Sequence, residues 1–575
     1  MIRKISFENY KAFEKGEIKL KPITILLGAN SVGKSSIINL LLMLQQTANS
    51  NTYKSALRLH GENISMGECE NIFRNRDTSR NISIEFEFES DRLKDVLKKD
   101  LFEELVSQIF QPMEFLSRFP PEEIEKEVQV DINQFVNSRR EIDSKIYKSK
   151  EQFLKLLETT KLLYEHSELI KSDIFKYYIR RSKITLDNTR TIDLLYDFLK
   201  NTQEIINGNQ FNLFIELCYV ESSKREKVIK IKEIKLKQGE HVILDVIFEQ
   251  IRGKYSYNSV SIETELLPME SPKELLDENA KEEFLKLINY EATIFSWLPS
   301  TKKPMDFFLD FRQEDKSIAT NLILKIIDIS LSSVKSNFTR ELINHISPLR
   351  AHPKRFYFLD KANINTVLDT LDGDSLTEIL KENNTIKENV NNWLSKFGLK
   401  VDVSTIQDVV HQLKIHQHTL DLDITDVGFG ISQILPIIVQ GFLSFKGSLT
   451  MVEQPEIHLH PKMQAELADL FIDIVNRKVE SQRKKQKDLD NGQKYLLIET
   501  HSEYLLKRLM RRINEKVIAS DQVAVYFIEP PKEEGQPALI IEKEISEEGS
   551  FEWPKDFYEG EVALDNCNFI KMLYR

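Results

Sequence analysis

Apolar residues recur along the chain with a period of two in some segments and with helical spacing in others. The nearly continuous apolar run Ile23–Leu27 is typical of a strand that is buried on both faces. Residues Asn81–Glu89 alternate apolar and polar side chains, which predicts a half-exposed strand in an antiparallel sheet. Further strands are expected at Ile5–Phe13, Glu17–Leu20, Phe214–Val220, Val228–Leu236, His241–Glu249 and Tyr255–Glu265.

Helical spacing dominates the stretch that interrupts these strands. The chain has no glycine between Glu68 and Asn207, and from Asp91 onward it is dense in Leu, Ile, Lys and Glu. We expect a helical insertion here, in the form of a compact bundle or short arm, because the apolar heptads do not persist as they would in a long coiled coil. Helices are also expected from Pro272 to about Leu349, and again up to Phe397.

The composition is that of an ordinary soluble protein of 575 residues, with 41% hydrophobic residues, 29% charged residues and a formal net charge of −11. This charge excludes a surface that is basic all over, although a local basic patch can still contact nucleic acid. Cys69, Cys218 and Cys567 form neither a zinc spacing nor a disulfide framework. Since no apolar run could cross a bilayer and the first residues lack a signal-peptide core, we expect a cytoplasmic protein with no membrane partner.

A glycine-framed loop, Gly28–Gly33, joins the buried strand to an apolar helix. The glycines let successive backbone N–H groups turn inward toward an anion, and the helix start adds its own N–H groups and the positive end of its dipole. Lys34 would reach β- and γ-phosphates, and the Ser35 hydroxyl would ligate magnesium. The predicted binding residues for a nucleoside triphosphate with Mg²⁺ are Gly28, Asn30, Ser31, Gly33, Lys34, Ser35 and Ser36.

Two later strands end in polar residues that suit the same site. The segment Gly447–Pro461 contains a strand ending at Glu453, whose carboxylate would be a magnesium ligand. The segment Lys494–Ser502 is a buried strand followed by His501, which would contact the γ-phosphate and sense hydrolysis. Each strand end is weak evidence alone, because a capping glutamate or a structural histidine would look the same.

The segment Asp426–Gln433 places two glycines and a serine at the start of the apolar helix Ile434–Phe442. This pattern predicts a second anion site. A single chain has no second triphosphate to fill it, whereas a second protomer does.

The order of these motifs resembles that of the ATP-binding-cassette ATPases of the RecF, SMC and OLD type. It is most similar to the soluble prokaryotic AAA ATPases whose carboxy-terminal portion is a family of unknown function. The resemblance covers roughly the first 90 residues and everything from Ser347 onward, and it rests on Gly28–Ser35, Pro348–Arg350, Asp426–Pro436, Glu453–Pro461, Glu499–Leu506 and Trp553 with the proline after it.

The resemblance implies an α/β fold: an ABC-type phosphate-loop ATPase head with a mixed sheet, flanking helices, an antiparallel β subdomain and a large helical insertion. The implied segments are 1–92 for the N-terminal part of the head, 93–210 for the insertion, 211–270 for the β subdomain, 271–400 for a helical region and 401–575 for the C-terminal part of the head.

The resemblance also implies residue roles, with ATP and Mg²⁺ as cofactors. Lys34 and Ser35 bind phosphate and metal, Glu453 is the Walker B acid and His501 is the switch histidine. Gly430 and Ser432 act on the ATP of a partner protomer, so ATP brings two heads together as a homodimer, with higher oligomers left open. The glutamine loop of such heads has only Gln45 and Gln46 as candidates.

One departure concerns the residue after the Walker B acid. The glutamate that usually polarises the attacking water is replaced by Gln454. An amide orients water but cannot accept its proton, and such base roles are typically worth about 10²–10⁴-fold in rate. Either Glu456 takes over this role, or hydrolysis is slow and ATP mainly holds the dimer closed.

These features lead to two functional hypotheses. The first is an ATPase that dimerises around ATP and controls a DNA-directed partner, such as a separately encoded nuclease, in antiphage defence or genome maintenance. The second is an ATP-gated scaffold or sensor with negligible turnover. An energising subunit of a membrane transporter is disfavoured by the large insertion and the OLD-like motifs.

Neither a built-in nuclease nor a DNA surface is clearly indicated. The residues after His501 lack the glutamate and DxD pair of a Toprim nuclease. Basic residues gather at Arg483–Lys487 and again on a helix at Lys507, Arg508, Arg511 and Arg512, where a DNA-phosphate stripe and a simple exposed face are equally good interpretations. In the loop Ser347–Arg355, Arg350 or Arg355 is a candidate phosphate contact, with a surface turn as the alternative.

Overall fold

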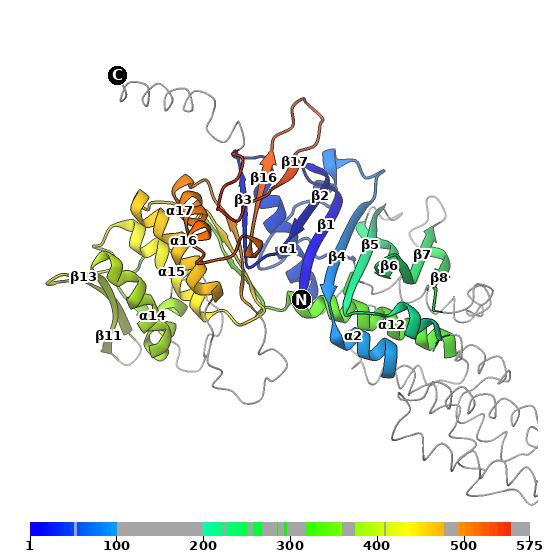
Figure 1. Ribbon diagram of the computed structural model, residues 1–575, viewed down its shortest axis with the longest axis horizontal. Helices are drawn as coiled ribbons and strands as arrows, with labels where there is room; N and C mark the ends of the chain where they lie inside the picture. Colours follow the sequence, from blue (N-terminus) through cyan, green and yellow to red (C-terminus); the bar gives the residue numbers. More distant parts are fainter. Residues whose placement is uncertain are drawn as a thin grey trace, which may run out of the picture. The chain divides into compact units, whose positions relative to one another are not determined.

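The computed structural model (Figure 1) describes residues 1–50, 55–100, 198, 200–221, 226–250, 257–266, 285, 293–295, 318–358, 374–407, 410–476 and 493–553. The chain divides into two compact units. The first unit comprises Met1–Asn49, Leu59–Asp77 and Ser336–Arg575, and the second comprises Ser50–Arg58 and Thr78–Lys335.

The first unit is built on a six-stranded sheet with the strand order β17-β16-β3-β15-β14-β9. All neighbouring strands are parallel except β17, which runs antiparallel to β16. The strands are β3 (Ile23–Gly28), β9 (Ile343–Ile346), β14 (Leu449–Glu453), β15 (Tyr495–Glu499), β16 (Val523–Glu529) and β17 (Leu539–Lys543). Every residue of β3, β14 and β15 is buried, as expected for central strands covered on both faces.

Helices cover this sheet through one large apolar core. Ile25, Val452 and Ile498 of the strands belong to the same buried cluster as residues of the helices that follow the later motifs. These helices are α15 (Phe429–Leu443), α16 (Pro461–Asn476) and α17 (Glu503–Asn514). The helix α1 (Lys34–Ala48) follows β3 directly, and an N-terminal hairpin is formed by β1 (Ile2–Tyr10) and β2 (Phe13–Lys19).

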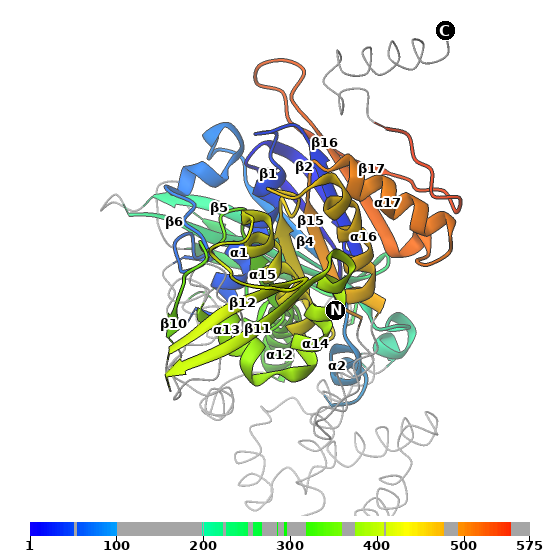
Figure 2. The same cartoon turned by 90° about the vertical axis from the view of Figure 1, so that its left-hand side faces the viewer.

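A smaller antiparallel sheet belongs to the same unit, with the order β10-β12-β11, and β13 also pairs with β12. Its strands are β10 (Tyr357–Phe358), β11 (Leu399–Gln407), β12 (Val410–Gln417) and β13 (Leu420–Asp423). Figure 2 shows β11 and β12 beside α13 (Asp374–Glu382) and α14 (Asn384–Leu394). Short 3₁₀ turns lie at Cys69–Ile72, Arg74–Arg76, Ser336–Phe338, Ser395–Phe397 and Ser520–Gln522.

The second unit contains an antiparallel meander of the strands β4 (Ile82–Glu89), β5 (Gln210–Glu221), β6 (Lys227–Gln238), β7 (His241–Gln250) and β8 (Tyr257–Glu263). β4 pairs directly with β5, and Asn212 donates a hydrogen bond to Glu85 across a separation of 127 positions. Helices in the described residues of this unit include α2 (Asp91–Asp95), which continues as a π-helical turn at Val96–Asp100, and α12 (Ile318–Lys335).

The architecture confirms the expected α/β class with a mixed sheet, flanking helices and an antiparallel β subdomain. The prediction of helix from Pro272 to about Leu349 was wrong in its last part, because Ile343–Ile346 forms the edge strand β9. Most of the predicted helical insertion, residues 101–197, lies outside the described residues. In the described parts of the chain, no helix is both long and apolar enough to cross a membrane.

Candidate functional site

The loop between β3 and α1 has the curled backbone that the sequence predicts. Gly28, Ser31 and Gly33 all have positive φ angles, of 144°, 64° and 113°. A Cβ atom on Gly28 would lie 2.6 Å from the backbone oxygen of Ile528 in β16, so no other residue fits there. Ala29, Asn30 and Ser31 are exposed at the tip of the loop. The tip of this loop therefore lies at the surface, at the carboxyl end of β3.

Lys34, the first residue of α1, folds back over this loop. Its Nζ donates hydrogen bonds to the backbone oxygens of Gly28 and Ala29, at 3.0 and 2.7 Å. The residue is only 3% exposed. Burial lowers the pKa of Lys34, and the negative charges of Glu499 and Glu456 oppose this effect.

Two glutamates meet next to Lys34 and Ser35. Ser35 Oγ donates a hydrogen bond of 3.0 Å to Glu499 Oε2, and Lys34 Nζ lies 3.8 Å from Glu499 Oε1. Glu453 is paired with Glu499 in the parallel register of β14 and β15, so the two carboxyl groups are neighbours. Burial first and the neighbouring Glu453 second raise the pKa of Glu499 to about 7. Glu499 is therefore harder to ionise than an ordinary glutamate.

Glu453 is held from the opposite side by β9 and the loop that follows it. His345 Nε2 and Glu453 Oε1 are 2.7 Å apart. Arg350 donates from Nη2 to the backbone oxygens of Glu453 and Gln454, at 2.8 and 3.3 Å. Arg350 is 5% exposed, and within the described parts of the chain its Nε and Nη1 have no hydrogen-bond partner. Burial lowers the pKa of Arg350 to about 10, while Glu456 and Glu453 counteract the shift.

Gln454 adopts an unusual backbone conformation at the end of β14. Its φ angle is 44°, in the left-handed region that residues other than glycine seldom adopt. Its N–H donates to the backbone oxygen of Glu499 at 2.7 Å, and its own oxygen accepts from Arg350. These two contacts hold the conformation in place, as is common for strained residues at functional sites.

Glu456 joins the loop after β14 to the end of β15. Its Oε2 accepts from the hydroxyl of Thr500 at 2.8 Å, and its Oε1 accepts from the backbone N–H of His501 at 2.7 Å. Burial raises the pKa of Glu456, although these hydrogen bonds favour the charged form. The carboxylate thus orients the main chain at His501.

His501 is exposed at the mouth of this cluster. Partial desolvation of the ring lowers the pKa of His501, and the positive charge of Lys34 lowers it further. The imidazole is therefore kept neutral at physiological pH.

The predicted second anion site lies at the start of α15. The helix begins at Phe429, so Gly430 and Ser432 are in its first turn. A Cβ atom on Gly430 would lie 2.6 Å from the backbone oxygen of His458. Ser432 is only 6% exposed, whereas Gly428 before the helix is exposed. The groups accessible to a partner here are the backbone N–H groups at the helix start rather than the Ser432 side chain.

The remaining candidates are occupied by structural contacts. The N–H of Ser36 donates a hydrogen bond to the backbone oxygen of Gly33. The backbone oxygen of Ser36 accepts a hydrogen bond of 3.1 Å from the hydroxyl of Tyr10. Arg355 pairs with Asp426 at 3.2 Å on the surface. Gln45 donates to the backbone oxygen of Ile343, and Gln46 accepts from the N–H of Ile64, near the C-terminal end of α1. Neither glutamine reaches the phosphate loop.

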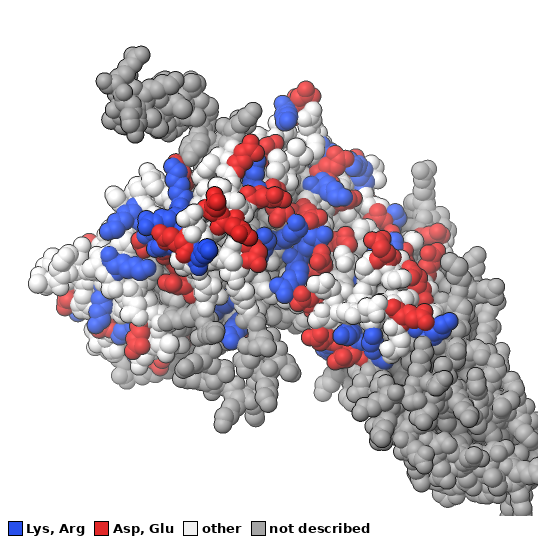
Figure 3. All heavy atoms as spheres, in the orientation of Figure 1, with Lys and Arg blue, Asp and Glu red and all other residues white. Residues whose placement is uncertain are grey.

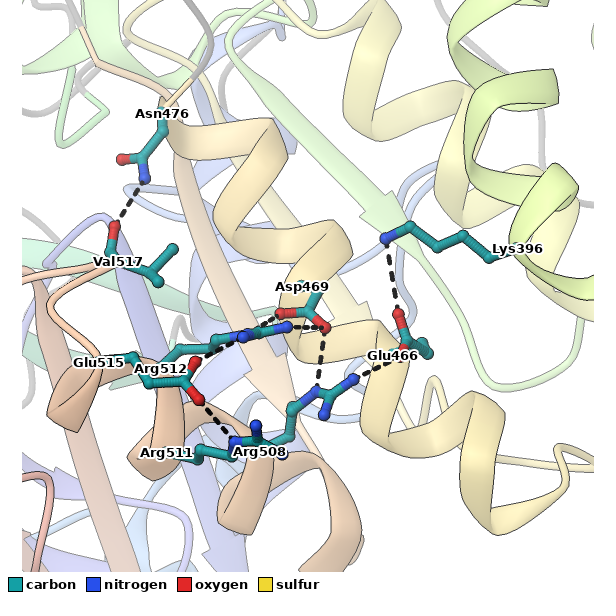
Figure 4. A network of polar contacts seen from close by, with 9 residues as sticks. All are labelled: Lys396, Glu466, Asp469, Asn476, Arg508, Arg511, Arg512, Glu515 and Val517. Carbon is teal, nitrogen blue, oxygen red and sulfur yellow. Dashed lines mark hydrogen bonds and ion pairs between the residues drawn. The ribbon is translucent and has the colours of Figure 1, made fainter.

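The basic helix α17 is neutralised by acids (Figure 4). Arg508 and Arg512 both contact Asp469 of α16, and Arg508 also reaches Glu466. Arg511 pairs with Glu515, which follows the helix. On the face shown in Figure 3, positive and negative side chains are interspersed. These pairs favour the interpretation of α17 as a structural face rather than a DNA-phosphate stripe. The second basic cluster, Arg483–Lys487, lies outside the described residues.

The donor set fits the cofactors that the motifs imply. The side chains that meet between α1, β14 and β15 offer oxygen atoms from Ser35, Glu453 and Glu499, and Mg²⁺ prefers oxygen ligands. Among the described residues, Lys34 Nζ contacts the backbone oxygens of the loop and the Glu499 carboxylate, and a phosphate would replace these contacts with stronger charge pairing.

Sequence reasoning missed two members of this cluster. Glu499 stands at the end of a predicted strand, but the strand order that places it beside Ser35 is not visible in the sequence. His345 was not recognised as a site residue because the sequence pattern predicted a helix where β9 lies. A polar residue directly after the apolar residues of each parallel strand is the signal that would have pointed to Glu499.

Comparison with known proteins adds three findings. The model of a family described as AAA ATPase domain matches residues 1–506. Endonuclease GajA of Bacillus cereus (strain HuB5-5) is 24% identical over 275 residues, and the match covers 43% of this chain but only 37% of that relative. The SMC head domain from Thermotoga maritima is 8% identical with a TM-score of 0.30, over 94% of this chain and 98% of that one.

Proposed function

Since the chain belongs to the AAA ATPase domain family, we propose that it binds ATP with Mg²⁺, hydrolyses it, and uses ATP to close a homodimer. The observation that carries the proposal is the convergence of Lys34, Ser35 and two glutamates at the carboxyl edge of one parallel sheet. Ligands of open α/β sheets bind at this edge.

Each group at this edge has a distinct part in the proposed reaction. Lys34 leaves the backbone oxygens of the loop and pairs with the β- and γ-phosphates. Ser35 and Glu453 would hold the magnesium ion, whose charge would offset the negative charge that develops on the phosphoryl group. His501, kept neutral and oriented through Glu456, contacts the γ-phosphate.

A partner protomer completes the site. The start of α15, with Gly428 exposed, presents helix N–H groups that suit the γ-phosphate bound by the other chain. Gly430 keeps the loop His458–Leu459 close to this helix start, because a larger residue would collide with His458.

The proposed output is control of a DNA-directed partner, such as a separately encoded nuclease, in antiphage defence or genome maintenance. The similarity to an endonuclease supports this direction, and it extends over 37% of that relative. The paired arginines of α17 give no support to direct DNA binding by that helix.

Phosphate release by the purified full chain tests the proposal. Lys34→Ala removes the charge that pairs with the phosphates, and we expect ATP turnover to be abolished. Lys15→Ala is the matched control, because Lys15 is 73% exposed on the β1–β2 hairpin and should leave turnover unchanged.

Gln454 favours a second candidate, an ATP-gated scaffold with negligible turnover. The amide cannot accept the proton of the attacking water, and the oxygens of Glu456, the alternative base, already accept from Thr500 and His501. Tight ATP binding by the wild-type chain without phosphate release would support the scaffold and rule out the enzyme.

A further inference from the structure

The serine after the phosphate-loop lysine faces Glu499 rather than Glu453. Ser35 Oγ donates to Glu499 Oε2 at 3.0 Å. Glu453 is held on its far side, where its Oε1 lies 2.7 Å from His345 Nε2. Glu499 therefore stands between the phosphate loop and the acid to which the sequence assigns the metal.

The sheet fixes this position. β15 lies between β3 and β14, and the parallel registers pair Glu499 with Leu26 on one side and with Glu453 on the other. Side chains alternate between the two faces of a strand, so residues paired across parallel strands project from the same face. Because Glu499 is only 3% exposed, its carboxylate has no alternative position in solvent.

The hydrogen bond to Ser35 has a consequence for metal binding. A serine hydroxyl has one proton to donate and two lone pairs to offer. To ligate a cation it must turn a lone pair toward the metal and its proton elsewhere. The Ser35 hydroxyl already donates its hydrogen bond to Glu499, so its lone pairs remain for a cation, and Ser35 is exposed.

We propose that Glu499 is a positioning residue of the magnesium site: it accepts a hydrogen bond from the Ser35 hydroxyl, orients that hydroxyl toward the cation and adds a negative charge beside Glu453. The inference rests on the proposed ATP-binding function. Magnesium is usually held by one or two carboxylates together with substrate phosphates, so two acids on adjacent strands match its requirements.

Manganese binding tests this role directly. Mn²⁺, an EPR-visible substitute for Mg²⁺, is titrated into the full chain with saturating AMP-PNP, a non-hydrolysable ATP analogue. Glu499→Met removes the carboxylate at similar side-chain length, and we expect Mn²⁺ affinity to fall about 10–100-fold, as for the loss of other residues that orient metal ligands. Glu499→Gln keeps an oxygen that can accept the hydrogen bond from Ser35, so the loss of Mn²⁺ affinity in this variant should be smaller.

A second measurement separates this role from a structural one. AMP-PNP binding in EDTA does not involve the metal, and it should not weaken in either Glu499 variant. Glu529→Gln is the matched control, because Glu529 ends β16, the strand on the opposite side of β3, and should leave both affinities unchanged.

Failure of the Glu499 role and failure of the proposed ATP-binding function give different results. Unchanged Mn²⁺ affinity in both Glu499 variants would overturn the inference, as would an equal loss of AMP-PNP affinity in EDTA. A wild-type chain that binds AMP-PNP neither with metal nor without it would overturn the proposed function itself.

Discussion

Single residues at the carboxyl edge of the parallel sheet are held in place by more than one element. Glu453 is contacted by His345 from β9, by Arg350 from the following loop and by Glu499 from β15. Gln454 is fixed in a left-handed conformation by its neighbours on both sides. Such redundancy fixes the orientation of these side chains, as the proposed ATP site would require of a preorganised arrangement.

The rate of ATP turnover at the proposed site should depend on Gln454, because its amide cannot accept a proton from the attacking water. We predict that Gln454→Glu raises the rate of phosphate release about tenfold or more, because a correctly placed base is typically worth 10²–10⁴-fold. The substitution keeps the backbone of residue 454 in place, because Arg350 and the backbone oxygen of Glu499 contact its main-chain atoms. Steady-state phosphate release measures the effect.

Gln536→Glu, at an exposed position, is the control for the added charge and should leave the rate unchanged. An unchanged or lower rate in Gln454→Glu would show that the water is activated elsewhere, with Glu456 as the next residue to test.

At the scale of elements, α16 and α17 are joined by charges as well as by apolar packing. Leu467 and Leu470 of α16 share the buried core with Leu505 and Leu509 of α17. Asp469 lies between Arg508 and Arg512 at the rim of this contact (Figure 4). Burial disfavours the charge on Asp469, but the hydrogen bonds from the two arginines outweigh it and hold its pKa below the usual value.

We predict that Asp469→Asn lowers the free energy of unfolding by about 1–3 kcal/mol at neutral pH, the range for leaving a buried polar partner unsatisfied. Because the folded-state pKa of Asp469 is depressed, its contribution is present above the unfolded pKa and is lost as the pH falls through the folded value. The difference between the thermal unfolding midpoints of variant and wild type should therefore shrink below about pH 4.

Glu515→Gln serves as the control, because Glu515 is more exposed and contacts only the outer side of the arginines. A midpoint difference for Asp469→Asn that persists unchanged at acidic pH would show that the loss arises from packing rather than from charge.

At the scale of the whole molecule, the start of α15 is proposed to contact the γ-phosphate bound by a partner protomer. Ser432 is buried in its own chain, so a large substitution there would disturb packing as well as dimerisation. Gly428 offers a cleaner test. Its φ angle is −50°, and a Cβ atom there would meet nothing within 4 Å.

We predict that ATP converts the wild-type chain to a dimer and that Gly428→Glu prevents this. The variant places a carboxylate opposite the γ-phosphate of the partner, and like charges in an interface cost several kcal/mol. Light scattering at saturating ATP measures the mass, and AMP-PNP binding confirms that the monomer still binds nucleotide.

Phe445→Glu adds the same charge just beyond the other end of α15, where the side chain is 46% exposed, and should still dimerise. A wild-type chain that stays monomeric at saturating ATP would refute the dimer, and a Gly428→Glu chain that dimerises normally would remove the helix start from the interface.

The sequence by itself determined the features that depend on local spacing. The apolar run at Ile23–Leu27, the glycines at 28 and 33 and the lysine and serine after them indicate a phosphate loop because each acts within one strand, turn and helix start. Alternation along Asn81–Glu89 and the later strands predicted the antiparallel meander for the same reason.

Only the tertiary structure decided which distant residues meet. Strand order places Glu499 between Ser35 and Glu453, and makes Ile343–Ile346 an edge strand that carries His345 to the acid. It also pairs the arginines of α17 with Asp469, so that they are not a free basic stripe. Local patterns cannot specify these contacts. Strand order and register depend on the simultaneous burial of many side chains, and these are hundreds of positions apart along the chain.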